Sequence, residues 1–299
     1  MEKCPICYSA KAVFFAEKSN FTYYQCRNCL SAFLSEFPSE KKIDTFYQRN
    51  FRYNAAVNEK EMRRRANHVL DKLLRFNPST KTILDIGSGY GFFLEEAEKR
   101  GINALGIEPS DHLFKESKSR KLTVNHQNLK EFIKTNKNKQ YDLVTLIHVI
   151  EHVNEPKKML VQLAKLLRPD GILYVETPNT NSFLFEFEKS DYTFLLVPDH
   201  LWLFSKKSFK FLLPVHLKIT DSLTYSYPEH LMGIIKSIFN LKEDKKNDLK
   251  KYLSSGNKSI GLTKKLKYLF FDKFLAVFFY RLLNMGGKGS ILELYIRKK

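Results

Sequence analysis

The spacing of apolar and polar positions changes along the chain, and each change marks a different kind of element. From Glu59 to Phe76 apolar residues recur at helical intervals, which predicts an amphipathic helix ended by Asn77-Pro78. Short buried runs then alternate with helical stretches, a pattern typical of a parallel sheet covered by helices on both faces. The predicted strands are 82–86, 104–107, 122–124, 143–147 and 172–177, and the predicted helices between them are 92–100, 113–119, 129–136 and 156–167.

The last third of the chain departs from this alternation. Beyond residue 209 it fades, and a helical, basic and aromatic segment from about 230 to 285 predicts an insertion. The turn 286–289 and the apolar run 291–297 predict a final strand laid antiparallel at the sheet edge. With a hairpin partner for that final strand, the six predicted strands become seven. We therefore expect a Rossmann-like, doubly wound α/β domain over residues 38–299, with a mostly parallel sheet of seven strands.

The first 37 residues hold all the cysteines of the chain, in two CxxC pairs eighteen residues apart. Aromatic runs between the pairs suit two short strands. In a reducing compartment this spacing matches a zinc ribbon with four thiolate ligands, and two disulfide bridges are the alternative. Four protein ligands leave no open position for water, so the metal would be structural. The predicted zinc ligands are Cys4, Cys7, Cys26 and Cys29.

A glycine-rich loop, Asp85-Ile86-Gly87-Ser88-Gly89-Tyr90-Gly91, follows the first strand of the α/β domain. Glycines let the backbone turn sharply there, and the start of the next helix favours an anion. Glu108 lies 21 residues past Gly87, where doubly wound folds place an acid against ribose hydroxyls. The third glycine comes one residue earlier than in GxGxxG. The pattern favours an adenosine-type cofactor over a dinucleotide, and a tight turn without a ligand is the alternative.

Five stretches in order resemble the motifs of class I S-adenosylmethionine-dependent methyltransferases. They are residues 83–91, 106–110, 141–144, 148–153 and 167–173. The nearest branch resembles the ubiquinone-pathway O-methyltransferases and the methyltransferases of sugar and cell-envelope glycan pathways, which also show a stretch like 198–205. The resemblance covers about residues 82–210 and implies methyl transfer from S-adenosylmethionine.

The resemblance also assigns cofactor contacts to individual residues. The three loop glycines would line the methionine moiety, Asp85 would order the loop, and Glu108 would hold the ribose. Asn128 stands where many relatives have an aspartate near the adenine amino group, and its amide oxygen can accept the same hydrogen bond. His148 would face the reactive end of the cofactor. The implied cofactor-binding residues are Asp85, Gly87, Gly89, Gly91, Glu108, Asn128 and His148.

Methyl transfer needs a nucleophile in line with the sulfonium methyl group and, for a hydroxyl or carbon acid, a base. His148 and His152 are four residues apart and would share a face of a helical turn at the mouth of the cleft. His152 is the first candidate for the base, with capping of the following helix as the alternative. His200, in the 198–205 stretch, is the second candidate. The predicted catalytic residues are His152, His148 and His200, beside a pocket lined by Thr177, Pro178 and Asn179.

The formal net charge of +18 would attract nucleic acid, anionic lipid or phosphorylated substrates. The lysines are spread along the chain without the motif of an RNA-binding module. A zinc ribbon accompanies this domain in sugar C-methyltransferases and in ribosomal RNA guanine methyltransferases. A small polar acceptor, a sugar or cell-envelope glycan precursor methylated on oxygen or carbon, is the favoured hypothesis. RNA methylation is the second. A non-catalytic binding module is the third, and the intact glycine loop and Glu108 oppose it.

The N-terminus and the segment 264–283 indicate where in the cell the protein would be found. The N-terminus reaches a cysteine pair before any apolar run, which predicts no secretory signal and a cytoplasmic protein. In 264–283 the longest uncharged run is seven residues, and spanning a bilayer takes about 20. That segment is predicted to be a lid on the sheet edge or a contact in a homodimer, with a helix on a membrane surface as the alternative.

Overall fold

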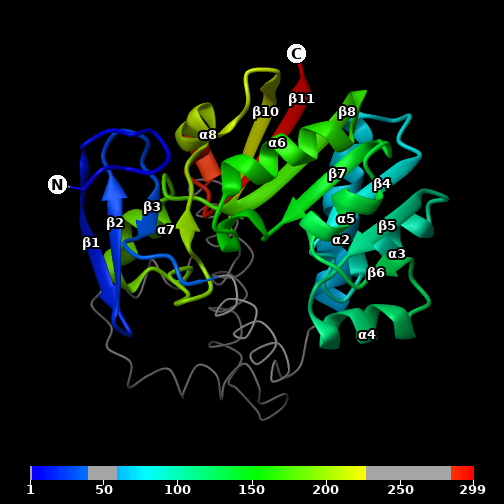
Figure 1. The fold of residues 1–299 in the computed structure, drawn as a ribbon, viewed down its shortest axis with the longest axis horizontal. Helices are drawn as coiled ribbons and strands as arrows, with labels where there is room; N and C mark the ends of the chain where they lie inside the picture. Colours follow the sequence, from blue (N-terminus) through cyan, green and yellow to red (C-terminus); the bar gives the residue numbers. More distant parts are fainter. Residues whose placement is uncertain (1, 40–58, 227–283) are drawn as a thin grey trace, which may run out of the picture.

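The computed structural model describes residues 2–39, 59–226 and 284–299. Figure 1 shows a small antiparallel sheet near the N-terminus beside a larger α/β unit. The predicted insertion 230–285 lies outside the described residues except for its last two positions, and the segment 264–283 lies outside them entirely. Within the described ranges no helix is long and apolar enough to cross a membrane.

The larger unit is built on a seven-stranded, mostly parallel sheet, which confirms the predicted fold class. Five neighbouring strands pair in parallel, the next strand along the sheet is antiparallel to them, and the strand beyond it again runs in the direction of the five. In spatial order the strands are β10 (Leu217–Tyr225), β11 (Ile291–Lys298), β8 (Leu167–Pro178), β7 (Tyr141–Ile147), β4 (Thr82–Ile86), β5 (Asn103–Ile107) and β6 (Val124–Asn125).

The position predicted for the last strand was wrong by one place. β11 is antiparallel as predicted, but it lies between β8 and β10, so β10 forms the sheet edge. Only the first residue of β10 is fully buried. An edge strand needs few apolar side chains, so its sequence carries no buried run that would have predicted it.

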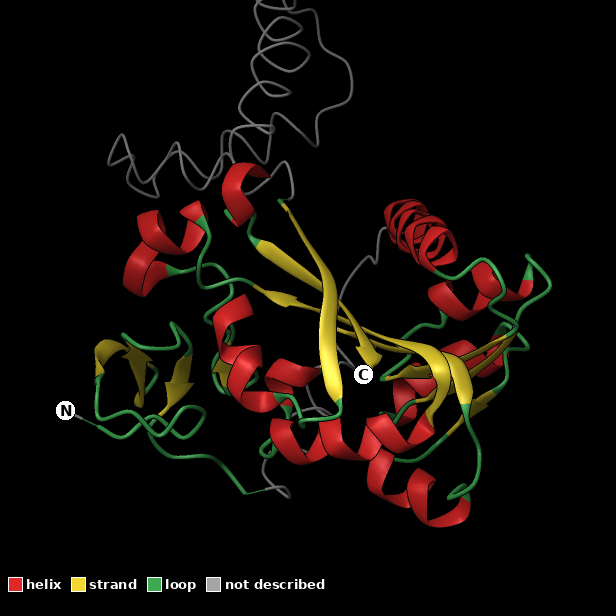
Figure 2. Cartoon of the chain, turned by 90° about the horizontal axis from the view of Figure 1, so that it is seen from above, coloured by secondary structure: helices red, strands yellow, loops and turns green. Residues whose placement is uncertain are grey.

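Helices cover both faces of this sheet, as Figure 2 shows. One face buries the apolar sides of α2 (Glu59–Phe76) and α3 (Phe92–Glu98), and the other buries α6 (Pro156–Leu166). The apolar spacing of α2 places Ala66, Val69, Leu70 and Leu73 in the core. The remaining α-helices of the described chain are α4 (Asp111–Ser119), α5 (Leu129–Thr135), α7 (Phe183–Glu188) and α8 (Lys206–Leu212).

The small sheet includes a strand from the larger unit. Its order is β1 (Ala12–Lys18), β2 (Phe21–Cys26), β3 (Ala32–Leu34) and β9 (Trp202–Leu203). β9 comes from the 198–205 stretch and pairs with β3 through Phe33 and Trp202. One continuous apolar core therefore runs from the cysteine-bearing unit into the α6 face of the large sheet.

Two buried acids face each other inside the large sheet. Glu176 on β8 and Glu293 on β11 are register partners, and neither side chain is exposed. The Tyr174 hydroxyl lies 2.8 Å from a Glu176 carboxylate oxygen and 3.0 Å from one of Glu293. Helix α2 supplies the opposite charges, since Arg65 pairs with Glu176 and Lys72 lies 2.9 Å from Glu293. The helix is therefore held on the sheet by ion pairs as well as by apolar contact.

Replacing Arg65 by methionine is expected to destabilise the protein by about 3–5 kcal/mol, because it removes the guanidinium that pairs with the buried Glu176 carboxylate. Arg64, next in sequence, pairs with Glu61 at the surface with its own side chain 74% exposed. The matched variant Arg64→Met should therefore change stability by less than about 0.5 kcal/mol. Urea unfolding of both variants checks this, and equal losses would contradict the importance of the buried pair.

Candidate functional site

The glycine loop joins β4 to α3 at the carboxyl edge of the parallel strands. Gly91 has φ of 79°, and a Cβ there would come 2.3 Å from Cδ1 of Leu122, so only glycine fits. Gly89 also has a left-handed φ of 55°, but a Cβ there would meet no protein atom within 4 Å. The backbone at Gly89 therefore faces open space, where a ligand can approach it closely.

Two buried acids support this loop. The carboxylate of Glu108 accepts hydrogen bonds from the backbone N–H groups of Gly89 and Ser110, each at 2.8 Å. Burial raises its pKa, and those two hydrogen bonds oppose that shift. Asp85 accepts a hydrogen bond from the Thr145 hydroxyl at 2.5 Å, and burial raises the pKa of Asp85 to about 7. Glu108 thus lies directly beside the open position at Gly89, whereas Asp85 ties β4 to β7.

Asn128 lies at the start of α5. Its side-chain oxygen accepts from the backbone N–H of Glu131, and the Glu131 carboxylate accepts in return from the backbone N–H of Asn128. This reciprocal pair is a capping box, which satisfies two backbone donors at the helix start. The predicted adenine contact of Asn128 stays a prediction, with helix capping as the role that the geometry displays.

The His148–Val153 motif lies next to the glycine loop because β7 and β4 are parallel neighbours. A Cβ on Gly87 would come 2.8 Å from Val149, so the two loops touch. His148 has a left-handed φ of 54°, and its ring nitrogens lie 3.0 Å from Glu151 and 3.3 Å from Glu176. Because both nitrogens face carboxylates, the His148 ring bridges the two acids.

The other two candidate histidines are brought together by the tertiary structure. The rings of His152 and His200 are 4.8 Å apart at an edge-to-face angle. Nδ1 of His152 lies 3.0 Å from the carboxylate of Asp199, and Nδ1 of His200 lies 2.7 Å from the carbonyl oxygen of Phe194. Each ring therefore has one nitrogen anchored, which orients the other.

The surroundings of His152, His200 and Glu151 shift the pKa values of these side chains in different directions. Burial alone would lower the pKa of His152, but its contacts with Asp199 outweigh burial and raise that pKa to about 9. Burial lowers the pKa of His200 to about 4, and the nearby His152 adds to the effect. Burial alone would raise the pKa of Glu151, but His148 and His152 lower it to about 2. The buried cluster thus holds a charged and a neutral imidazole side by side.

This cluster could also bind a divalent cation. Ligand-capable atoms of Glu151, His152 and His200 all lie within 4.8 Å of one another. Two imidazoles and a carboxylate are a common ligand set for zinc and related ions. The cluster therefore has the residue types for either proton transfer or metal binding.

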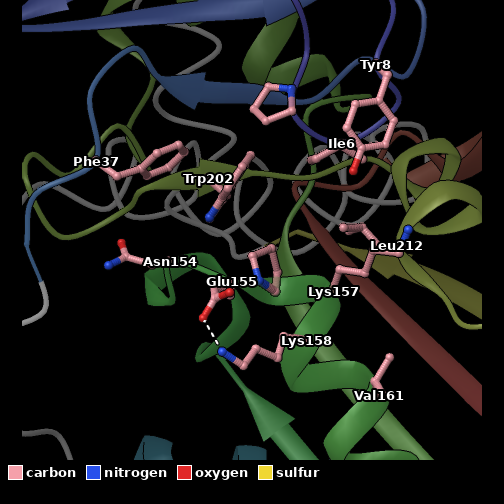
Figure 3. Close-up of a pocket in the computed structure, with 12 residues that line it drawn as sticks. Ile6, Tyr8, Phe37, Asn154, Glu155, Lys157, Lys158, Val161, Trp202 and Leu212 are labelled. Atoms are coloured by element: carbon pink, nitrogen blue, oxygen red, sulfur yellow. Dashed lines mark hydrogen bonds and ion pairs between the residues drawn. The ribbon is translucent and has the colours of Figure 1, made fainter.

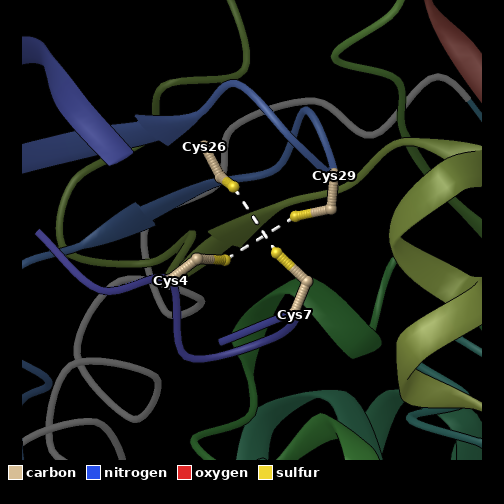
Figure 4. Close-up of side chains that lie close together, drawn as sticks. All are labelled: Cys4, Cys7, Cys26 and Cys29. Carbon is tan, nitrogen blue, oxygen red and sulfur yellow. Dashed lines mark hydrogen bonds between the residues drawn. The ribbon is translucent and has the colours of Figure 1, made fainter. Parts of the chain in front are cut away.

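The four cysteines form a second cluster, shown in Figure 4 with all four sulfurs directed toward a common centre. Cys4 and Cys29 have sulfurs 3.6 Å apart, as do Cys7 and Cys26. A disulfide would need about 2.05 Å, whereas tetrahedral zinc with bonds of about 2.3 Å separates its sulfurs by roughly 3.8 Å. The geometry fits four-thiolate metal binding and opposes the two disulfide bridges that were the alternative.

The loop that carries Asp199 and His200 is held between the cysteine-bearing unit and the His148–Val153 motif. The indole N–H of Trp202 donates to the carbonyl of Val153 at 2.8 Å, and the N–H of Leu201 donates to the carbonyl of Glu151 at 2.9 Å. On its other side β9 pairs with β3. The first two contacts join residues about fifty positions apart in sequence and the strand pairing joins residues about 170 apart, so the spacing of motifs could not have predicted them.

A cavity of about 480 Å³ opens beside this loop. Figure 3 shows Ile6, Tyr8 and Phe37 on one side of it and the start of α6 on the other, with Trp202 between. Asn154, two residues after His152, also lines it. Its size suits a small-molecule ligand.

Three residues of the site escaped sequence reasoning. Asp199 stood in the recognised 198–205 stretch but drew no role, because its contact with His152 is long-range. Glu176 looked like a strand residue, yet an acid inside a predicted buried strand is itself a signal of function. Arg65 lay on a predicted surface helix, and nothing local marked it.

Comparison with known proteins agrees with this geometry. A family model described as "Methyltransferase domain" matches residues 59–213, slightly more than half of the chain. The ubiquinone biosynthesis O-methyltransferase of Coxiella burnetii (strain RSA 493 / Nine Mile phase I) is 31% identical over 124 residues, covering 40% of this chain and 53% of that protein. The corresponding enzyme of Nitrosomonas europaea is 31% identical over 133 residues, covering 40% and 54%. The chain thus spans about half the length of these curated relatives.

Among solved structures, a SAM-dependent methyltransferase from Archaeoglobus fulgidus has a TM-score of 0.51 at 19% identity. The match covers 79% of this chain and 94% of that one. At this identity the likeness bears on the fold alone, and it agrees with the sheet described above.

Proposed function

Because the chain belongs to the methyltransferase family and carries a class I S-adenosylmethionine-dependent domain, we propose that it methylates a small polar acceptor, a sugar or cell-envelope glycan precursor. The curated relatives are named as O-methyltransferases, which supports a hydroxyl oxygen as the acceptor atom over carbon. The single observation that carries the proposal is the open left-handed backbone at Gly89 beside the buried carboxylate of Glu108.

The loop residues fit the cofactor. Glu108 has carboxylate lone pairs beyond those used by Gly89 and Ser110, and these can accept from ribose hydroxyls. The N-terminus of α3, at Phe92, favours the carboxylate of the methionine moiety. When bound, S-adenosylmethionine supplies an activated methyl group on a sulfonium. The protein then has to orient the acceptor and take up its proton.

Transfer of label from tritiated S-adenosylmethionine tests this function. The acceptors are a panel of UDP-linked and dTDP-linked hexoses, free hexoses and total RNA. Transfer of label to a hexose hydroxyl is the expected result. Calorimetric titration with S-adenosylmethionine runs beside it, and the absence of binding would exclude the enzyme altogether.

We assign His152 as the general base, with Asp199 orienting it. The Nδ1 contact with Asp199 leaves the second ring nitrogen to accept a proton, and the carboxylate makes the imidazole more basic. The side chain of His152 is 14% exposed, whereas His200 is 4% exposed as a residue. His152 therefore has better access to an acceptor, and His200 packs against its ring.

Replacing His152 by glutamine is expected to lower the rate of methyl transfer by about 10²–10⁴-fold while S-adenosylmethionine binds as before. The loss follows from removal of the base, because the glycine loop is untouched. His216→Gln, at an exposed position, is the matched control and should keep full activity. A His152→Gln variant with the wild-type rate would remove His152 from the mechanism, and one that lost cofactor affinity would assign it a structural role.

The same assignment predicts a pH dependence. A base must be deprotonated, so with a His152 pKa of about 9 the rate should rise with pH up to about 9. Asp199→Asn removes the contact that raises this pKa, so the rising limb should move toward neutral pH even as the maximal rate falls. Rates are measured from pH 5 to 10 with the four-cysteine site left undisturbed. A flat profile over this range would favour His200, whose pKa is about 4.

The cavity beside Trp202 supports a small acceptor. It begins two residues from His152, and it combines aromatic side chains with the lysines at the start of α6. Aromatic faces with a few polar groups are typical of sugar and small-metabolite sites. Phe37→Ala should therefore raise the KM for the acceptor and leave cofactor affinity unchanged.

A structural zinc ion in the four-cysteine site is part of the proposal. The hydrogen bond with Cys4 lowers the pKa of the Cys29 thiol to about 5, and Ser31 contributes to the same shift, so one sulfur is already disposed to be a thiolate. Backbone and side-chain N–H groups of Asn28 lie 3.4 Å from the sulfurs of Cys26 and Cys7. Donors of this kind stabilise thiolate ligands.

RNA is the second candidate acceptor, favoured by the net charge of +18. Binding that weakens steeply as salt rises, together with label in the RNA fraction, would support it over the sugar.

A further inference from the structure

A buried tyrosine of the cysteine-bearing unit contacts the loop that carries Asp199 and His200. Tyr23 on β2 has no exposed surface, and its hydroxyl donates a hydrogen bond to the main-chain carbonyl of His200 at 2.7 Å. Asp199 is the preceding residue, and its carboxylate lies 3.0 Å from Nδ1 of His152. One hydroxyl thus holds the short turn on which both side chains sit.

The surrounding contacts show that this turn is anchored from the same side along its length. The Lys18 ammonium donates a hydrogen bond to the carbonyl of Leu195 at 2.9 Å. The N–H of Leu34 donates to the carbonyl of Leu201 at 3.1 Å. The Ser205 hydroxyl donates to the carbonyl of Cys29 at 2.6 Å. Of these anchors, Tyr23 is the one that bonds directly to a candidate catalytic residue.

We propose that Tyr23 is a positioning residue for methyl transfer, holding the Asp199–His200 turn against His152. This rests on the proposed function, in which His152 takes up the acceptor proton. Tyr23 acts through the main chain of the turn. Its strand β2 is paired on both sides, with β1 and β3. The hydroxyl therefore fixes the position of the His200 carbonyl, and with it the distance from Asp199 to the imidazole of His152.

The arrangement also links the cysteine site to catalysis. Tyr23 and Cys26 lie on the same strand, which ends at Cys26. Loss of the ligand geometry at Cys26 and Cys29 would free the end of β2 and the carbonyl that Ser205 contacts. A metal in the four-cysteine site would therefore stabilise the base as well as the small sheet.

The test is Tyr23→Phe, which removes the hydroxyl and keeps the ring. We expect kcat to fall about 10–100-fold, as for a displacement on the order of 1 Å at a base. The affinity for S-adenosylmethionine and the KM for the best acceptor of the panel should stay within about twofold, because the glycine loop and the cavity walls are unchanged. Tyr24→Phe is the matched control. It lies next in the same strand, and its hydroxyl makes no hydrogen bond to the described residues, so its kcat should be that of the wild type.

A second readout does not depend on activity. Trp202 is the one tryptophan of the chain, and it lies at the junction, paired with Phe33 and bonded to Val153. Its emission should be unchanged in Tyr23→Phe, which would show that the junction stays closed. Removing zinc with a chelator should shift the emission to longer wavelength as water reaches the indole. If Tyr23→Phe opens the junction, Lys18→Met provides a milder change to the same loop and should lower kcat by a smaller factor.

Three outcomes would overturn the proposal. They are a wild-type kcat in both Tyr23→Phe and Lys18→Met, an equal loss of kcat in Tyr24→Phe, and a rate loss that tracks cofactor affinity. A wild-type chain that transfers no methyl group would instead end the proposed function, while an active wild type with an unaffected Tyr23→Phe variant would end only the role of Tyr23.

Discussion

Replacing Gly89 by alanine is expected to abolish measurable binding of S-adenosylmethionine while the protein stays folded. The backbone at Gly89 has φ of 55°, and an added Cβ would point into space that no protein atom occupies within 4 Å. A methyl group there would stand where the cofactor approaches the loop. We expect an affinity loss of at least about 100-fold, roughly 2.8 kcal/mol. Calorimetric titration measures it.

The matched control is Gly101→Ala. Gly101 has φ of 74° and likewise no protein atom within 4 Å of an added Cβ, but it follows the far end of α3. Both substitutions carry the same backbone strain of roughly 1–2 kcal/mol. Both variants should therefore lose similar stability, and only Gly89→Ala should lose the cofactor. Equal affinities in the two variants would show that the open space at Gly89 is not the cofactor site.

Removing the proposed zinc ion from the four-cysteine site should cause the largest loss of stability. Structural zinc contributes about 10–16 kcal/mol to the folding of isolated zinc-finger peptides, and the zinc ion proposed here would use part of that energy to stabilise the shared core of the small sheet and α6. If about 5 kcal/mol is lost, the melting temperature should fall by roughly 10–20 °C. Cys29→Ala and chelation should have the same effect, followed by calorimetry and metal analysis.

The control for the metal is Glu17→Gln, an exposed change on the same unit, which should keep both the metal and the melting temperature. Adding zinc back to the chelated protein should restore its melting temperature. Purified wild-type chain with no bound metal, or a Cys29→Ala variant that melts with the wild type, would refute the zinc site. If the cysteines were instead oxidised to disulfides, a thiol reagent would detect no free thiols in the metal-free protein.

Much of the α/β unit followed from local sequence. Buried runs such as 82–86 and 143–147 can only be central strands, because both faces of a parallel sheet are covered. β10 could not be found in this way, since an edge strand is half exposed. β9 has two residues, and among the described strands it pairs with β3, which is far away in the chain. Such pairings are decided by tertiary packing.

For the candidate site, the sequence supplied the residue types and the structure supplied their contacts. The histidines were recognised from motifs, but their sequence spacing suggested that His148 and His152 would act as a pair. In the folded chain His148 bridges Glu151 and Glu176, and His152 lies against His200 and Asp199. The protonation states depend on burial and on these partners, neither of which is encoded locally.

By itself, the sequence determined the methyltransferase fold class, the glycine loop with Glu108, and the four-cysteine motif. Each depends on neighbours close in the chain or on a fixed spacing, so short-range sterics and hydrophobic periodicity suffice. Only the tertiary structure decided that β9 completes the small sheet, that Tyr23 bonds to the carbonyl of His200, and that Asp199 lies against His152. Those contacts arise when two units bury a common apolar core, and that burial depends on the whole chain.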